Sequence, residues 1–124
     1  MSEIKQVIVI RKDLKMRRGK EIAQGSHASA MFITKRIKNG SGSFLTAEEI
    51  EWLESGTTKV VVQVESEEHL MQIYHAALDR KLEVNLITDY GKTEFKGVPT
   101  KTCLAIGPHE NSKIDEITQY LQLY

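Results

Sequence analysis

Short apolar runs alternate along the chain with longer amphipathic stretches. Residues 6–10 and 59–64 are rich in β-branched side chains and predict strands, the first nearly continuous, as in strands buried on both faces. Residues 84–87 and 102–106 predict two further strands, and Gly107-Pro108 is expected to stop the last one.

The longest amphipathic stretch, residues 19–38, predicts a helix that Asn39-Gly40 ends. Its apolar positions recur at helical spacing and are expected to face the core. They are Ile22, Ala23, Ala30, Ile33 and Ile37.

Three shorter helices follow. Thr46 and Glu49 form a capping-box pattern that opens a helix over residues 46–56. Ser66 is expected to cap the next helix, and a last one should begin near Ser112. Their core-facing residues are expected to be Leu70, Ile73, Tyr74, Ala77 and Leu78, then Ile114, Ile117 and Leu121.

The predicted order of elements is β-α-α-β-α-β-β-α. Strands alternating with helices indicate an α/β fold of three layers, in which helices flank a four-stranded sheet. The last two strands are joined by about a dozen residues without helical pattern, so we expect them to pair antiparallel and the sheet to be mixed. No boundary divides the chain, which predicts a single domain over residues 1–124.

Composition narrows the class of protein. The chain has 124 residues, 40% of them hydrophobic and 27% charged, as in ordinary globular domains. No apolar run approaches the roughly 18–20 residues that span a bilayer, and the N-terminus lacks the apolar core of a secretory signal. The single cysteine excludes an internal disulfide framework and suits a reducing compartment.

Charge is unevenly distributed although it sums to zero. Residues 1–38 contain ten basic and three acidic residues, a net charge of +7, and the other 86 residues contain seven basic and fourteen acidic, a net charge of −7. Such asymmetry favours a polyanionic partner, while a solvated face whose charges pair after folding remains the alternative.

A basic segment follows the first strand and leads into the first helix. Gly19 permits close backbone approach, Lys20 lies in the first helical turn, and a helix N-terminus attracts anions. The upstream glycine and the Ser/Thr of a Walker A loop are missing, so a nucleotide loop is excluded.

Asp89 and Thr93 follow the third strand, where functional groups gather in α/β sheets. Asp89 is a candidate general base with Thr93 as its partner, or both belong to an ordinary turn. Cys103, in the middle of a strand, is expected to be a buried inert thiol. The four histidines lack metal-site spacing, so no metal is expected; His27, near the basic segment, is the one that could serve a site.

Taken together, the chain resembles the type 2 (archaeal and eukaryotic) peptidyl-tRNA hydrolase family from Val7 to Tyr124. The resemblance rests on ordered segments with near-matching spacing. They are residues 7–16, Gly19-Lys20, Ala23-Gln24, residues 26–28, residues 59–68, Asp89, Gly91 and Thr93, Thr102 with residues 104–108, and residues 115–118 with Leu121.

The resemblance implies a cytoplasmic enzyme, usually a homodimer, that cleaves the ester between a peptide and the 3′ end of tRNA without metal or cofactor. It places the catalytic residues at Lys20, Asp89, Thr93 and Thr102. It also implies positioning roles for Gly19, Gln24, His27 and Gly91, and contacts to tRNA phosphates from Lys12, Lys15, Arg17 and Arg18.

Three questions stay open at this level. Tyr90 replaces the family's usual alanine beside Asp89, where it would narrow the site or stack on the terminal adenine. Either Thr100 or Thr102 takes the family's threonine role. A non-catalytic relative that binds tRNA or a protein is the alternative to an active hydrolase.

Overall fold

The computed structural model describes residues 3–40, 45–91 and 95–124. Its elements follow the predicted order. They are β1 (Ile4–Arg11), the short 3₁₀ turn η1 (Lys12–Leu14), α1 (Arg18–Lys38), α2 (Ala47–Glu54), β2 (Lys59–Val64), α3 (Glu67–Asp79), β3 (Val84–Asp89), β4 (Thr100–Glu110) and α4 (Asn111–Thr118). The sheet order is β2-β1-β4-β3, with β1 and β2 parallel and the other pairs antiparallel. The predicted mixed four-stranded α/β fold is therefore confirmed.

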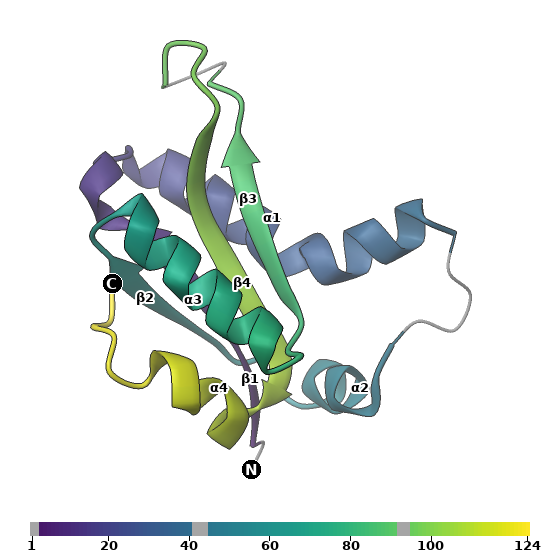
Figure 1. Cartoon of the computed structure of the whole chain (residues 1–124). Coiled ribbons are helices and arrows are strands. Elements are labelled where there is room, and N and C mark those ends of the chain that lie inside the picture. The colour runs from purple at the N-terminus through teal and green to yellow at the C-terminus, as the bar shows by residue number, and fades with distance from the viewer. Residues whose placement is uncertain (1–2, 41–44, 92–94) are drawn as a thin grey trace.

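Helices cover both faces of the sheet, as Figure 1 shows, with α3 and α4 in front and α1 behind. Residues of β1 alternate between the two layers, because successive strand side chains point to opposite faces. Val7 and Val9 join the core under α3 and α4, whereas Ile8 and Ile10 pack on the side of α1. Each face thus has its own apolar core.

Local signals place the helix ends where they were expected. The Thr46 hydroxyl accepts from the Glu49 N–H while the Glu49 carboxylate accepts from the Thr46 N–H, which completes the capping box of α2. The Ser66 hydroxyl likewise accepts from His69 N–H at the start of α3. Leu78 on α3 is exposed and does not join the core, while Leu121 packs against it from beyond the end of α4.

The predicted apolar face of α1 is wrong except at Ile33, which is half-buried and packs against a core cluster that contains Phe32 and Trp52. Ile22 and Ile37 are 63% and 62% exposed, and Ala23 and Ala30 are also exposed. The buried face consists of Gln24, Gly25, Ala28, Ser29 and Phe32. Small residues let this helix approach the sheet closely, and its buried polar groups find partners there: the Ser29 hydroxyl donates to Gln6 Oε1 at 2.5 Å.

The predicted stop at Gly107-Pro108 is also wrong, because β4 continues to Glu110. Lys5 pairs with His109 and Val7 with Ile106, so two residues of β4 lie opposite one residue of β1. Pro108 occupies this bulge, where the absence of an N–H costs no ladder hydrogen bond.

The last residues of the chain run along the outer edge of β2. Gln63 N–H donates to Gln122 O and Tyr124 N–H donates to Val61 O, both at 3.0 Å. Val62 and Leu123 form an antiparallel bridge between these two contacts. The free side of β2 is thereby paired over part of its length.

Candidate active site

An ion pair joins the start of α1 to the end of β3. Lys20, in the first turn of α1, donates from Nζ to the carboxylate of Asp89, the last residue of β3. The two side chains keep only 14% and 11% of their accessible surface. Residues 69 positions apart in sequence are thus brought together in a shielded setting, where charge interactions are stronger than in open water.

The Asp89 carboxylate is also fixed from the backbone. Its Oδ1 accepts from Gly91 N–H at 2.7 Å, and Gly91 adopts φ +79°. A Cβ at Gly91 would come within 2.6 Å of Val98 N, so this turn requires glycine. The hydrogen bond from Lys20 lowers the pKa of Asp89, with a smaller contribution from Gly91 N–H. Asp89 is therefore a carboxylate at neutral pH.

A buried hydrogen-bond chain extends behind the ion pair. Gln24 Nε2 lies 3.5 Å from Asp89 Oδ2, and Gln24 Oε1 accepts from the Thr102 hydroxyl at 2.5 Å. Thr102 has no accessible surface, whereas the Thr100 hydroxyl donates to Val98 O outside this chain. Thr102 is thus the threonine connected to Asp89 through Gln24, and its burial keeps it from touching a ligand itself.

The ion pair opens into a cavity of about 270 Å³. Of the expected site residues, Lys20, Gln24, His27 and Asp89 line it. Tyr90 stands at its rim with 69% of its surface exposed.

Three residues near this cavity escaped the sequence reasoning. Ile87 and Thr88 line it, and their place just before Asp89 on the same strand was the available signal. The Phe95 ring centre lies 6.0 Å from Lys20 Nζ, within reach of a cation–π interaction. No pattern in the sequence pointed to Phe95. Thr93 and the rest of residues 92–94 lie outside the described residues.

The expected phosphate-binding residues surround the entrance to α1. Lys12, Lys15, Arg17 and Arg18 are all exposed, as is Gly19, which has open space where a side chain would be. Arg11 anchors this segment: its guanidinium donates to both carboxylate oxygens of Asp13, at 3.1 and 2.7 Å, and to Lys101 O at 3.0 Å.

Of the three basic residues in the last turn of α1, Lys35 and Arg36 pair with acidic residues, whereas Lys38 is exposed. Arg36 donates to both Glu49 oxygens, at 2.6 and 3.0 Å, and to Glu83 at 2.7 Å. Lys35 pairs with Glu83 at 2.5 Å. The positive charge that remains exposed on the described part of residues 1–38 is therefore richest beside Lys20.

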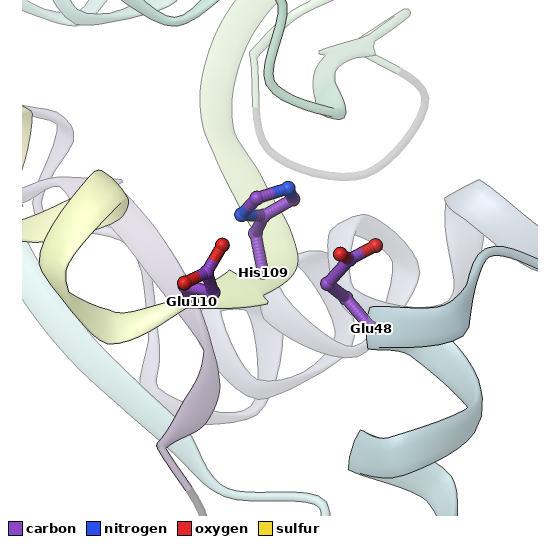
Figure 2. A group of neighbouring side chains, drawn as sticks. All are labelled: Glu48, His109 and Glu110. Carbon is purple, nitrogen blue, oxygen red and sulfur yellow. The ribbon is translucent and has the colours of Figure 1, made fainter.

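Two features lie away from this cavity. A larger apolar cavity of about 640 Å³ is found on the opposite flank of α1, with Ile22, Ile33, Trp52, Val61 and Tyr124 among its lining residues. At the far end of β4, one ligand atom each from Glu48, His109 and Glu110 lies within 4.8 Å of the others (Figure 2). No metal-ligating group of this kind was expected from sequence.

No described helix is both long and apolar enough to cross a membrane.

Buried Cys103 cannot serve this site as a nucleophile. Its side chain is fully inaccessible, and burial raises its pKa to about 11. A thiol of that kind stays protonated at neutral pH. The described residues of the site therefore offer a cation paired with a carboxylate, groups that can stabilise developing negative charge and orient a water molecule.

Comparisons with known proteins agree on one family. The model of the family described as "Peptidyl-tRNA hydrolase PTH2" matches residues 4–124. A protein named "Peptidyl-tRNA hydrolase" from Methanocaldococcus jannaschii is 42% identical over 121 residues, 97% of this chain and 99% of that protein. "Peptidyl-tRNA hydrolase 2, mitochondrial" from Mus musculus is 40% identical over 122 residues, which are 98% of this chain and 64% of the mouse protein.

A solved structure shares the fold at low identity. It is described as "Structure of Protein of Unknown Function Atu0240 from Agrobacteriium tumerfaciencs str. C58" and matches with a TM-score of 0.65 and 14% identity, covering 100% of this chain and 99% of that one. This likeness concerns the fold alone.

Proposed function

The chain belongs to the peptidyl-tRNA hydrolase PTH2 family, and from that membership we propose that it hydrolyses the ester bond between a peptide and the 3′ end of tRNA. The observation that carries this proposal to particular residues is the Lys20–Asp89 ion pair beside the cavity. A cation and a carboxylate there provide for both needs of ester hydrolysis, a stabilised oxyanion and an oriented water.

We assign complementary tasks to the two charged residues. While Lys20 is paired with it, Asp89 is a weak base because its pKa is lowered. As the water oxygen attacks the carbonyl carbon, negative charge grows on the carbonyl oxygen, and Lys20 turns towards it. Asp89 then loses its partner, gains proton affinity and accepts one water proton.

The same proton completes the reaction. The tetrahedral intermediate collapses, the bond between the carbonyl carbon and the ribose oxygen breaks, and Asp89 returns the proton to that oxygen. Collapse gives tRNA with a free 3′ hydroxyl and a peptide carboxylic acid, which then loses its proton to solvent water and becomes a carboxylate. Gln24 and Thr102 hold the Asp89 carboxylate in place during these steps, and His27 faces the substrate from the cavity wall. Thr93 completes the proposed site as a partner of the water.

The segment around the start of α1 is proposed to bind the tRNA backbone. Lys12, Lys15, Arg17 and Arg18 are exposed around the start of α1, and open space at Gly19 lets a phosphate approach the helix N-terminus. Contacts of this kind release counterions, so the affinity for tRNA should fall as salt rises. They carry no base sequence information, as suits an enzyme for many tRNAs.

We also propose that the protein works as a homodimer in the cytoplasm. Exposed Ile22 and Val61 and half-buried Ile33 line the larger cavity and form an apolar surface that a second copy would cover. Val61→Glu, which places a charge there, should shift the mass in solution from dimer to monomer. A monomeric wild-type protein would contradict this part of the proposal.

The cytoplasm is where ribosomes generate the substrate; two mammalian relatives are named mitochondrial.

The direct test is release of free tRNA from an N-blocked aminoacyl-tRNA. Lys20→Ala and Asp89→Asn should each lower kcat about 100-fold or more while circular dichroism remains that of the wild type. Lys5 and Asp115 form a matched lysine–aspartate pair at 2.5 Å beside α4, so Lys5→Ala and Asp115→Asn should retain activity. Wild-type rates in both site variants would refute the placement of the site. Tight tRNA binding without turnover by the wild type would instead favour the non-catalytic alternative.

A further inference from the structure

We propose that Glu48, His109 and Glu110 form a binding site for a divalent transition-metal ion such as Zn²⁺. The three residues come from two separate parts of the chain: Glu48 lies in the first turn of α2, while His109 and Glu110 end β4 just before α4. Figure 2 shows the His109 ring standing between the two carboxylates. This proposal does not depend on the hydrolase activity.

The three side chains bring their ligand atoms close together. One from each residue lies within 4.8 Å of the others. Zinc bonds of about 2.0–2.1 Å in tetrahedral geometry require ligands about 3.4 Å apart, so the side chains must close by an ångström or so. Rotation of two glutamate side chains that are only partly buried or exposed provides that movement. One imidazole and two carboxylates leave a fourth position for water.

Two buried polar atoms at this turn have no hydrogen-bond partner in the protein. Within the described residues, the buried side-chain atoms without a hydrogen bond are His109 Nδ1 and Asn111 Oδ1, on either side of Glu110. A buried polar atom without a protein partner is costly, so these two atoms favour a polar group or an ion bound at this turn. That both such atoms fall at this turn separates it from an ordinary patch of surface acids.

The local charge also favours a bound cation. Among the described residues no lysine or arginine forms an ion pair with Glu48 or Glu110. The N-termini of α2 and α4 favour these carboxylates and oppose a cation, but each helix end carries only about half a charge. Two full negative charges outweigh it. The imidazole then selects a transition metal, because Mg²⁺ and Ca²⁺ prefer ligand sets made of oxygen.

The site lies far from the proposed chemistry. Thr102 and His109 lie seven positions apart on β4, about 20 Å of extended chain. A metal here would fasten the start of α2 to the junction of β4 and α4. We therefore expect it to act on stability and to leave the hydrolytic site unchanged.

The experiment is titration of the EDTA-treated full chain with ZnCl₂ by isothermal calorimetry. We expect one Zn²⁺ per chain, with affinity at least tenfold weaker in His109→Ala and in Glu110→Gln. With free Zn²⁺ about 100-fold above its Kd, Tm should rise by about 10 °C in the wild type, and EDTA should reverse the rise. His75→Ala, which removes an exposed histidine on α3, is the matched control and should bind as the wild type does.

Two outcomes would overturn the proposal. One is the absence of saturable Zn²⁺ binding by the wild type, which would show that these three side chains do not bind a metal ion. The other is equal binding by the wild type and Glu110→Gln, which would place the ion elsewhere. Because Glu110 is exposed, its variant retains the fold even if His109→Ala does not.

Discussion

Thr102→Val is the sharpest test of the buried chain behind the ion pair. Valine matches threonine in shape but lacks the hydroxyl that donates to Gln24 Oε1 at 2.5 Å. Thr102 is fully inaccessible and Gln24 is 8% exposed, so water cannot replace the lost donor. An unsatisfied buried acceptor costs about 1–3 kcal/mol, which for a chain of this size lowers Tm by about 3–15 °C.

The same substitution should affect catalysis separately from stability. The Gln24 side chain accepts from Thr102 at its Oε1 and donates to Asp89 from its Nε2. Loss of the Thr102 hydroxyl should let the Gln24 amide move, and the Asp89 carboxylate would then be held less firmly. Because Thr102 cannot touch substrate, KM should stay constant while kcat falls about tenfold, equivalent to about 1.4 kcal/mol of lost positioning. Tm and steady-state release of tRNA, both measured well below the transition, give the two numbers independently.

Two further variants define the result. Thr102→Ser keeps the hydroxyl and should recover most of kcat. Thr118→Val removes another buried threonine hydroxyl, one that donates only to Ile114 O in its own helix at 3.3 Å, and should leave kcat unchanged. If Thr102→Val showed wild-type Tm and kcat, the hydrogen-bond chain would have no part in the site.

Three more predictions follow from the same geometry. The pKa of Asp89 is lower in the folded protein than in the unfolded chain. Its carboxylate therefore stabilises the fold fully at pH values above the ordinary aspartate pKa near 4. This stabilisation is lost as the pH falls through the lower pKa of the folded protein. The difference in unfolding free energy between the wild type and Asp89→Asn should thus be constant from pH 7 to about pH 5 and shrink below about pH 4; a difference that grows with acid would contradict it. Cys103, with its pKa raised to about 11, should react with a thiol reagent at pH 8 only after denaturant is added, and fast labelling of the native protein would disprove its burial. Tyr90→Ala should raise KM about tenfold and Tyr90→Phe should not, since stacking on the terminal adenine is worth about 1–3 kcal/mol; equal KM in both variants would remove Tyr90 from substrate binding.

Element order was predictable because each element carried a local signal. Thr46 and Glu49 marked the start of α2 and Ser66 that of α3, and the β-branched run at Val60–Val62 marked β2. These signals depend on neighbours within a few residues. The mixed sheet followed from the short link between β3 and β4.

The errors arose where distant segments decide the outcome. Hydrophobicity placed Ile22 and Ile37 in the core, but close packing and the hydrogen bond to Gln6 bury Ser29 instead. The extension of β4 past Pro108 depends on a register shift against β1. Neither the partner of a buried polar group nor a register shift is written in local periodicity.

In the candidate site too, positions set by local sequence were predictable, whereas contacts between distant segments were not. The position of Asp89 at a strand end was visible in sequence, and so was Lys20 in a first helical turn. Their contact, and the choice of Thr102 over Thr100, required the packing of α1 on the sheet. Phe95 beside Lys20 lies in a loop and gave no signal.

The pairing of residues 122–124 with β2 leaves the sheet asymmetric at its two margins. An outer strand normally offers a row of free N–H and C=O groups to any extended chain. On β2, however, Val61 C=O already accepts from Tyr124 N–H, and Gln63 N–H already donates to Gln122 C=O. Within the described part of the chain, the margin that stays available for a new strand is that of β3, and a segment that added there would arrive beside Asp89. Removing residues 122–124 would therefore expose a second unpaired edge strand, which could pair with extended chains of other molecules.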